Sequence, residues 1–183
     1  MALRRIHKKN PFDRLMFILF LLFVFGVFIG CGSAEHSDIP QIDYTAELDE
    51  GNYTSALWRA AQFHIVVCVA AVCSAGVILI PVTIMLRGYF LACTSAVIGV
   101  QEPLAAWIIC GLPAFLQLPS LFALSCAGMR LSALLHSKSI SRRIAIGRVQ
   151  FAKYIGWSII GILLCAVADR YIAPLLLQYF INL

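Results

Sequence analysis

Long apolar runs dominate this sequence, and each is close to the length that a helix needs to cross a lipid bilayer. A hydrocarbon core of ~30 Å is crossed by about 20 helical residues at ~1.5 Å each. Of the 183 residues, 61% are hydrophobic and only 13% are charged, and the mean hydropathy is +0.89. Soluble domains average about 45–50% apolar and about 25% charged residues. The sequence therefore predicts an all-α integral membrane protein that forms a single membrane domain over residues 1–183.

Five spans fit the apolar runs best. The predicted spans are residues 15–31, 61–86, 88–110, 113–135 and 154–168. They are joined by an external acidic loop at 32–60 and a cytoplasmic basic loop at 136–153, and an external tail follows at 169–183. Residues 101–103, Pro113 and Pro119 interrupt the central runs. Whether residues 88–119 cross the membrane or are re-entrant stays open at this point.

The basic residues set the expected orientation, because lysine and arginine concentrate in cytoplasmic loops. With a cytoplasmic N-terminus, twelve of the fourteen basic residues lie inside and only Arg59 and Arg170 lie outside. Arg87 then falls at the inner end of the second span and Arg130 near the inner end of the fourth. Six of the nine acidic residues lie in the external loop. The formal net charge of +5 thus indicates topology signals rather than a nucleic-acid partner.

The C-terminal tail is expected to lie outside the membrane. Asp169 and Arg170 mark the outer headgroup level, and Pro174 is expected to end the fifth helix. The remaining apolar and aromatic residues suit an interfacial helix, because the stretch is too short to cross again.

Small residues at helical spacing indicate faces where helices pack closely. Gly26 and Gly30 form a GxxxG pair in the first span, and Gly128 narrows the fourth span beside Ala127. Such residues let two helix backbones approach, so that dispersion contacts hold the helices together. The first span, the external acidic loop and the 169–183 tail are the candidate docking elements for partners, and whether the chain forms a homo-oligomer stays open.

The chemistry-bearing residues give no catalytic or metal-binding pattern. Seven cysteines lack both CxxC pairs and zinc spacings, so they predict packing residues. Cys31 follows a basic and apolar leader as in a lipoprotein site, but an uncleaved first span is the favoured interpretation. HExxH, GxSxG, P-loop and GxGxxG motifs are absent. We expect neither an enzyme nor a cofactor site.

Three ionisable residues lie within or beside the apolar runs, where charges mark functional candidates. His64 lies near the outer end of the second span, Glu102 begins a turn, and Arg130 can reach the headgroups along its own stem. These structural roles are favoured over a proton relay.

The fourth span contains two prolines with a glutamine between them. Pro113 and Pro119 each free a carbonyl group about one turn upstream, and lipid offers it no partner. Gln117 is expected to donate to such a carbonyl. The pattern predicts a kinked entry over 111–119 followed by a regular helix over 120–135.

The order of these features resembles the stage II sporulation protein M family of endospore-forming bacteria. The resemblance rests on the segments GVFIG, LIPVTIMLRGYFLACTSAVIG, LPAFLQLPSLFALSCAGMRLS and ADRYIAPLLLQYF. It runs nearly end to end. The family often has a glutamate at the position of Gln117, so this chain keeps a polar group there without the charge.

The resemblance implies a non-enzymatic scaffold in the mother-cell membrane at the sporulation septum. Its implied partners are sporulation proteins D, a lytic transglycosylase, and P, an amidase. Together they would thin the septal wall and remodel peptidoglycan during engulfment of the forespore. A transport or channel component is the alternative, because interrupted helices can expose backbone groups to a solute.

Overall fold

The computed structural model describes residues 11–34, 53–137 and 141–181, and every regular element in these ranges is helical. The elements are α1 (Pro11–Ala34), α3 (Tyr53–Ala71), α4 (Gly76–Gln101), α5 (Pro103–Ala106), the π-helical turn η1 (Trp107–Gly111), α6 (Leu112–His136), α7 (Ser141–Val167), the π-helical turn η2 (Ala168–Ile172) and α8 (Ala173–Ile181). Most of the predicted acidic loop, residues 35–52, lies outside the described ranges.

Five helical stretches in the described residues are long and apolar enough to cross a membrane. They are Phe12–Ala34, Tyr53–Ala71, Gly76–Val100, Pro103–His136 and Arg143–Phe180. The expectation of an all-α protein with about five membrane-spanning helices is therefore confirmed.

The boundary between the second and third stretches differs from the expectation. The chain turns at residues 72–75, inside the predicted span 61–86, and the next helix runs through the predicted boundary to Gln101. Ser132 of α6 holds this turn, because its hydroxyl donates to the Cys73 carbonyl oxygen at 2.7 Å. A side chain on Gly76 would collide with the Ala70 carbonyl, so the close approach requires glycine. The turn contains no proline or charge, which is why the apolar pattern runs through it.

Proline residues interrupt the helices less than expected. The helix continues through Pro119, and the chain from Pro103 to His136 is one helical stretch. The expected helix break at Pro174 is likewise wrong, because helical structure continues through it to Ile181. A widened π-helical turn lies just before Pro113, and the helix is unbroken from Leu112 through Pro119. The kink expected over 111–119 stays a prediction.

The helix accommodates Pro113 and Pro174 in the same way, by a π-helical turn just before each proline. Each follows a five-residue π-helical turn and one further residue. The Leu112 N–H bonds to the Trp107 carbonyl, and the Ala173 N–H bonds to the Ala168 carbonyl, so both bonds span five residues. A π-helical turn widens the helix, and this gives room for a ring that has no N–H to donate.

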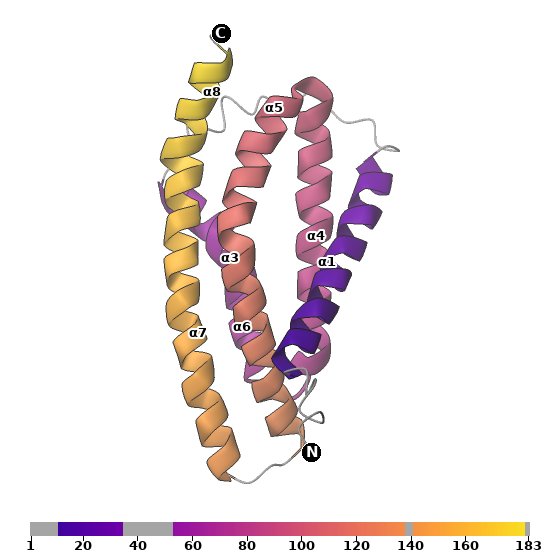
Figure 1. Cartoon of the computed structure of the whole chain (residues 1–183), viewed down its shortest axis with the longest axis vertical. Helices are drawn as coiled ribbons and strands as arrows, with labels where there is room; N and C mark the ends of the chain where they lie inside the picture. The colour runs from indigo at the N-terminus through magenta and orange to yellow at the C-terminus, as the bar shows by residue number, and fades with distance from the viewer. Residues whose placement is uncertain (1–10, 35–52, 138–140, 182–183) are drawn as a thin grey trace, which may run out of the picture.

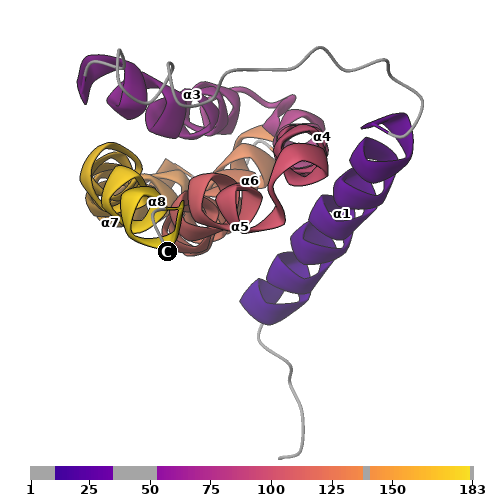
Figure 2. The same ribbon diagram turned by 90° about the horizontal axis from the view of Figure 1, so that it is seen from above.

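The helices form an upright bundle (Figure 1). We call the end where α7 begins the Arg143 end, and the end where α4 turns into α5 the Glu102 end. Seen from above, α6 lies in the middle, α3, α4 and α7 lie around it, and α1 lies at the edge beside α4 (Figure 2). Glu102, with extended backbone angles of −144° and 105°, is the residue at which the chain reverses between α4 and α5.

The buried apolar residues form two clusters. The larger joins α1, α3, α4, α6 and α7 and includes Phe23, which packs edge-on against Phe122 with ring centroids 5.7 Å apart. The smaller, at the Glu102 end, joins α4, α5, η1 and α8 and includes Ala105 and Leu177. Leu91 packs against both clusters.

Candidate functional site

A cavity of about 760 Å³ lies between α3 and α4, beside Leu91 and towards the Glu102 end. α3 and α4 supply most of its lining, and η1, α6, α7 and η2 complete it. The polar side chains around it are Arg59, Gln62, Arg87, Thr94, Gln117 and Asp169. Aromatic and aliphatic side chains and three cysteines form the rest of the surface. The polar groups at this cavity thus come from four different elements, α3, α4, α6 and η2.

Arg87 lies in the middle of α4, eleven residues after Gly76 and fourteen before Gln101. At 1.5 Å per residue the helix ends are about 16 and 21 Å away, which is beyond the reach of an arginine side chain. The expected position at the inner end of a span is therefore wrong. The charge cannot extend to the headgroups and stays inside the bundle.

The guanidinium of Arg87 is held by neutral partners. Its Nη2 donates to Gln117 Oε1 at 2.6 Å, and its Cζ lies 5.1 Å from the centre of the Phe63 ring. The buried Nε has no hydrogen-bond partner. Among the described residues, no carboxylate forms an ion pair with Arg87. The part of the chain that the structure describes therefore offers Arg87 no counterion.

Gln117 is fully buried and joins three helices. Its side-chain oxygen accepts from Arg87 of α4, and its Nε2 donates to the Ala60 carbonyl oxygen of α3 at 2.5 Å. The expectation that Gln117 donates to a carbonyl freed by Pro113 or Pro119 is wrong, because the amide points away from its own helix. A local pattern cannot reveal such a partner, because the partner depends on how the helices pack.

His64 extends this network on α3. Its Nδ1 lies 3.2 Å from the Ala60 carbonyl oxygen, which can only accept, so Nδ1 carries a proton. Its Nε2 lies 3.2 Å from the Ser120 hydroxyl, which also lies 2.8 Å from the Gln117 carbonyl oxygen. The histidine is 2% exposed and serves as a buried hydrogen-bonding group of the α3–α6 contact.

An ion pair lies at another part of the cavity wall. Arg59 of α3 and Asp169 of η2 approach to 3.2 Å, with side-chain exposures of 44% and 16%. Both residues were expected at the outer side of the membrane, and the structure brings them together across 110 positions of sequence. The pair joins the start of α3 to the π-helical turn before Pro174.

The predicted packing glycines lie outside the cavity. A side chain at Gly26 would collide with the Met85 carbonyl, and one at Gly30 would meet Tyr89 and Ala92. The GxxxG pair thus faces α4, where Gly88 approaches the Phe23 carbonyl in return. Gly128 lies against Ala71 of α3, Ile80 of α4 and Phe151 of α7.

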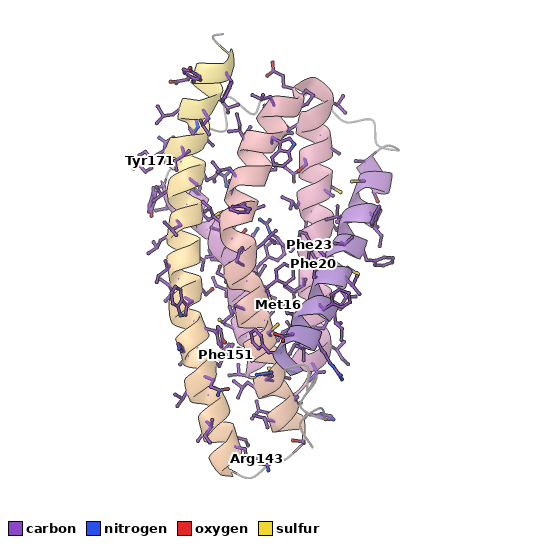
Figure 3. The ribbon with its side chains drawn as sticks, in the orientation of Figure 1. Met16, Phe20, Phe23, Arg143, Phe151 and Tyr171 are labelled. Atoms are coloured by element: carbon purple, nitrogen blue, oxygen red, sulfur yellow. The ribbon has the colours of Figure 1, made fainter. Side chains whose placement is uncertain are left out.

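Arg130 lies in a second cavity of about 650 Å³ at the Arg143 end. Its Cζ lies 4.9 Å from the centre of the Phe12 ring of α1, and Arg143 and Lys153 of α7 also line the space. Figure 3 shows Arg143 near the start of α7, with Met16, Phe20 and Phe23 along α1, Phe151 higher on α7, and Tyr171 towards the opposite end. Glu102 is exposed at the far end of the bundle. The structure therefore places His64 and Gln117 in one network and separates Arg130 and Glu102 from it.

Metal binding finds no support in the described residues, where no group of three His, Cys, Asp or Glu side chains is close enough to hold an ion. Arg87 and the Arg59–Asp169 pair were missed as site residues. In the sequence, only the break at 101–103 indicated where the helix containing Arg87 ends, because the turn at 72–75 contains no proline or charge to mark where that helix begins.

Comparison with known proteins identifies the family of this chain. The family model described as stage II sporulation protein M matches residues 19–174, which include Arg87, Gln117, Asp169 and both π-helical turns. No curated protein and no solved structure matches the chain. The match covers most of the sequence and all the residues that line the cavity. This sporulation-related membrane protein belongs to the stage II sporulation protein M family.

Proposed function

We propose that this chain is a non-enzymatic membrane scaffold that anchors the peptidoglycan-degrading complex of engulfment. The observation that carries the proposal is the family match over residues 19–174. The proposed partners are sporulation proteins D and P, which would supply the lytic chemistry. The chain would hold them at the septum while the septal wall is thinned and the mother-cell membrane moves around the forespore.

The length of the last helix supports an anchor that reaches beyond the bilayer. The stretch Arg143–Phe180 has 38 residues, which corresponds to about 57 Å of helix, whereas the hydrocarbon core is ~30 Å thick. Gly161 of α7 packs against Ser120, close to the level of Gln117. Gln117 lies near the middle of the stretch Pro103–His136, so we place the centre of the bilayer at its level. About ten residues of α7 on either side of Gly161 then fill the hydrocarbon, and α8 extends to the headgroups and beyond.

The outer face of α8 is a suitable docking surface. Ala173 and Leu177 are buried against the neighbouring helices, whereas Leu175, Tyr179 and Phe180 are exposed. Exposed aromatic residues are enriched where proteins contact partners or the membrane interface. With a cytoplasmic N-terminus and an external C-terminus, this surface faces the wall, where the proposed partners act.

Crosslinked co-purification from sporulating cells tests the proposal. We expect the tagged chain to bring down both partners, and Leu175→Glu with Tyr179→Ala to reduce their recovery several-fold at an unchanged level of the chain. Trp157→Ala is the matched control, because Trp157 is equally exposed on α7 but lies within the bilayer. The proposal fails if both partners are absent from wild-type complexes and a deletion strain engulfs normally.

One argument for the alternative function, a transport or channel component, does not hold. It assumed a discontinuous central helix, but residues 103–136 are continuous through the η1 turn. The cavity beside Arg87 does not depend on a break in this helix and is considered separately below.

A further inference from the structure

We propose that the cavity beside Arg87 binds an anionic amphiphile. Arg87 would hold its single oxygen-acid group, a carboxylate or a phosphodiester, and the apolar walls would hold its chain. This site is independent of the proposed scaffold role, because it depends on charge and shape within the bundle rather than on the outer surface.

The charge balance of the cavity calls for an anion. The lining contains two arginines, Arg59 and Arg87, and one carboxylate, Asp169, which lies 3.2 Å from Arg59. Among the lining residues, the positive charges therefore exceed the negative charges by one. Gln117 is neutral and accepts one of the five N–H bonds that a guanidinium offers, and the Nε–H is buried without a partner. Arginine binds carboxylates and phosphates through two adjacent N–H groups.

Position excludes the usual alternative for a membrane arginine. A side chain near a helix end can extend to the lipid headgroups, but Arg87 lies too far from both ends of α4. Ionisable groups at such depth face the bundle interior and mark binding sites or pathways. The Phe63 ring and Gln117 fix the guanidinium, so the donors are already oriented before a ligand arrives.

The lining selects an amphiphile over a free inorganic anion. The volume of about 760 Å³ lies within the ~300–1,000 Å³ range of ligand pockets, far above the need of a single phosphate ion. Its wall is mostly apolar, and it includes Val66, Phe90, Leu91, Val97, Ile98 and Ile109. A cationic group in an apolar cavity fits a ligand with one charge and an apolar body.

Protection of a native cysteine measures binding directly. Cys93 lines the cavity and is partly buried, whereas Cys31 and Cys73 are exposed outside it and act as internal controls. The full chain, purified in a neutral detergent, is alkylated with N-ethylmaleimide and analysed by mass spectrometry. We expect saturating decanoate or dioctanoyl phosphatidylglycerol to slow Cys93 alkylation at least fivefold, and decanol or dioctanoylglycerol to have no effect.

The two anionic probes distinguish the source of the ligand. Stronger protection by the phosphatidylglycerol points to a phospholipid of the bilayer, and stronger protection by decanoate points to a free carboxylate amphiphile. Either result supports the site. Equal protection by the neutral probes, or no protection by either anion, overturns it.

Substitutions test whether Arg87 supplies the positive charge that binds the anion. Arg87→Gln is expected to abolish the protection, and Arg130→Gln, which changes the arginine of the other cavity, is expected to preserve it. If Arg87→Gln does not fold, Val97→Trp decides, because it fills the cavity while leaving the Arg87–Gln117 bond in place. If Arg87→Gln or Val97→Trp still shows anion-dependent protection of Cys93, the proposal is contradicted.

Discussion

Arg87, near the middle of α4, and Gln117, five residues after the start of α6, are joined by a 2.6 Å hydrogen bond from Nη2 to Oε1. Gln117 continues this link to α3 through the Ala60 carbonyl oxygen. One neutral side chain thus ties three helices together and orients the only arginine that lies in the middle of a helix of the described bundle.

Gln117→Leu should destabilise the bundle. The change leaves the Arg87 guanidinium without its hydrogen-bond acceptor, and hydrogen bonds between membrane helices contribute about 1–2 kcal/mol in model systems. We expect the free energy of unfolding to fall by about that amount, measured by thermal unfolding in detergent. Gln178→Leu is the control, because Gln178 is exposed on α8. Equal unfolding midpoints for the wild type and Gln117→Leu would show that the network contributes nothing.

Gly26→Ala should loosen α1 from the bundle. The added methyl group would collide with the Met85 carbonyl of α4, and overpacking of this kind costs about 1–3 kcal/mol. Gly32→Ala is a matched control on the same helix, because a side chain at Gly32 would meet none of the described residues within 4 Å. We expect thermal unfolding to shift for Gly26→Ala alone. A similar shift for both variants would point to a general effect of alanine in α1.

The Arg59–Asp169 pair should contribute little stability. Arg59 is 44% exposed, and exposed ion pairs typically contribute about 0.2–1 kcal/mol. A double-mutant cycle with Arg59→Gln and Asp169→Asn should therefore give a coupling energy below about 1 kcal/mol. A coupling several times larger would mean that the pair is shielded from solvent and is a main support of the η2 turn.

Native cysteines report the orientation of the bundle. Cys31 lies near the end of α1, and Cys73 lies in the turn between α3 and α4 at the opposite end. With a cytoplasmic N-terminus, a membrane-impermeant maleimide should label Cys31 in intact cells and Cys73 only after permeabilisation. Labelling of Cys73 alone in intact cells would reverse the orientation, and with it the assignment of α8 to the wall side.

Sequence patterns predicted the helical class and the number of spans, because length and hydropathy depend on each run by itself. They misplaced the second boundary, since the turn before Gly76 consists of small and apolar residues that resemble a membrane helix. They also predicted wrongly that Pro174 ends the fifth helix, because a preceding π-helical turn makes room for the proline ring and the helix continues.

The candidate site was less accessible to such patterns. His64 and Gln117 were recognised as polar groups in apolar runs, but their partners Ala60, Arg87 and Ser120 lie on other helices. The error at the 72–75 turn also moved Arg87 from the middle of a span to its end. Contacts of this kind follow from helix packing, which no local spacing encodes.

Localisation of the partner proteins tests the scaffold most directly. In a sporulating host that lacks this chain, fluorescent fusions of sporulation proteins D and P should no longer concentrate at the septum, and engulfment should stop before the septal wall is thinned. Restoring the wild-type chain should return both proteins to the septum. Normal septal enrichment of both proteins in the deletion strain, with completed engulfment, would contradict the account.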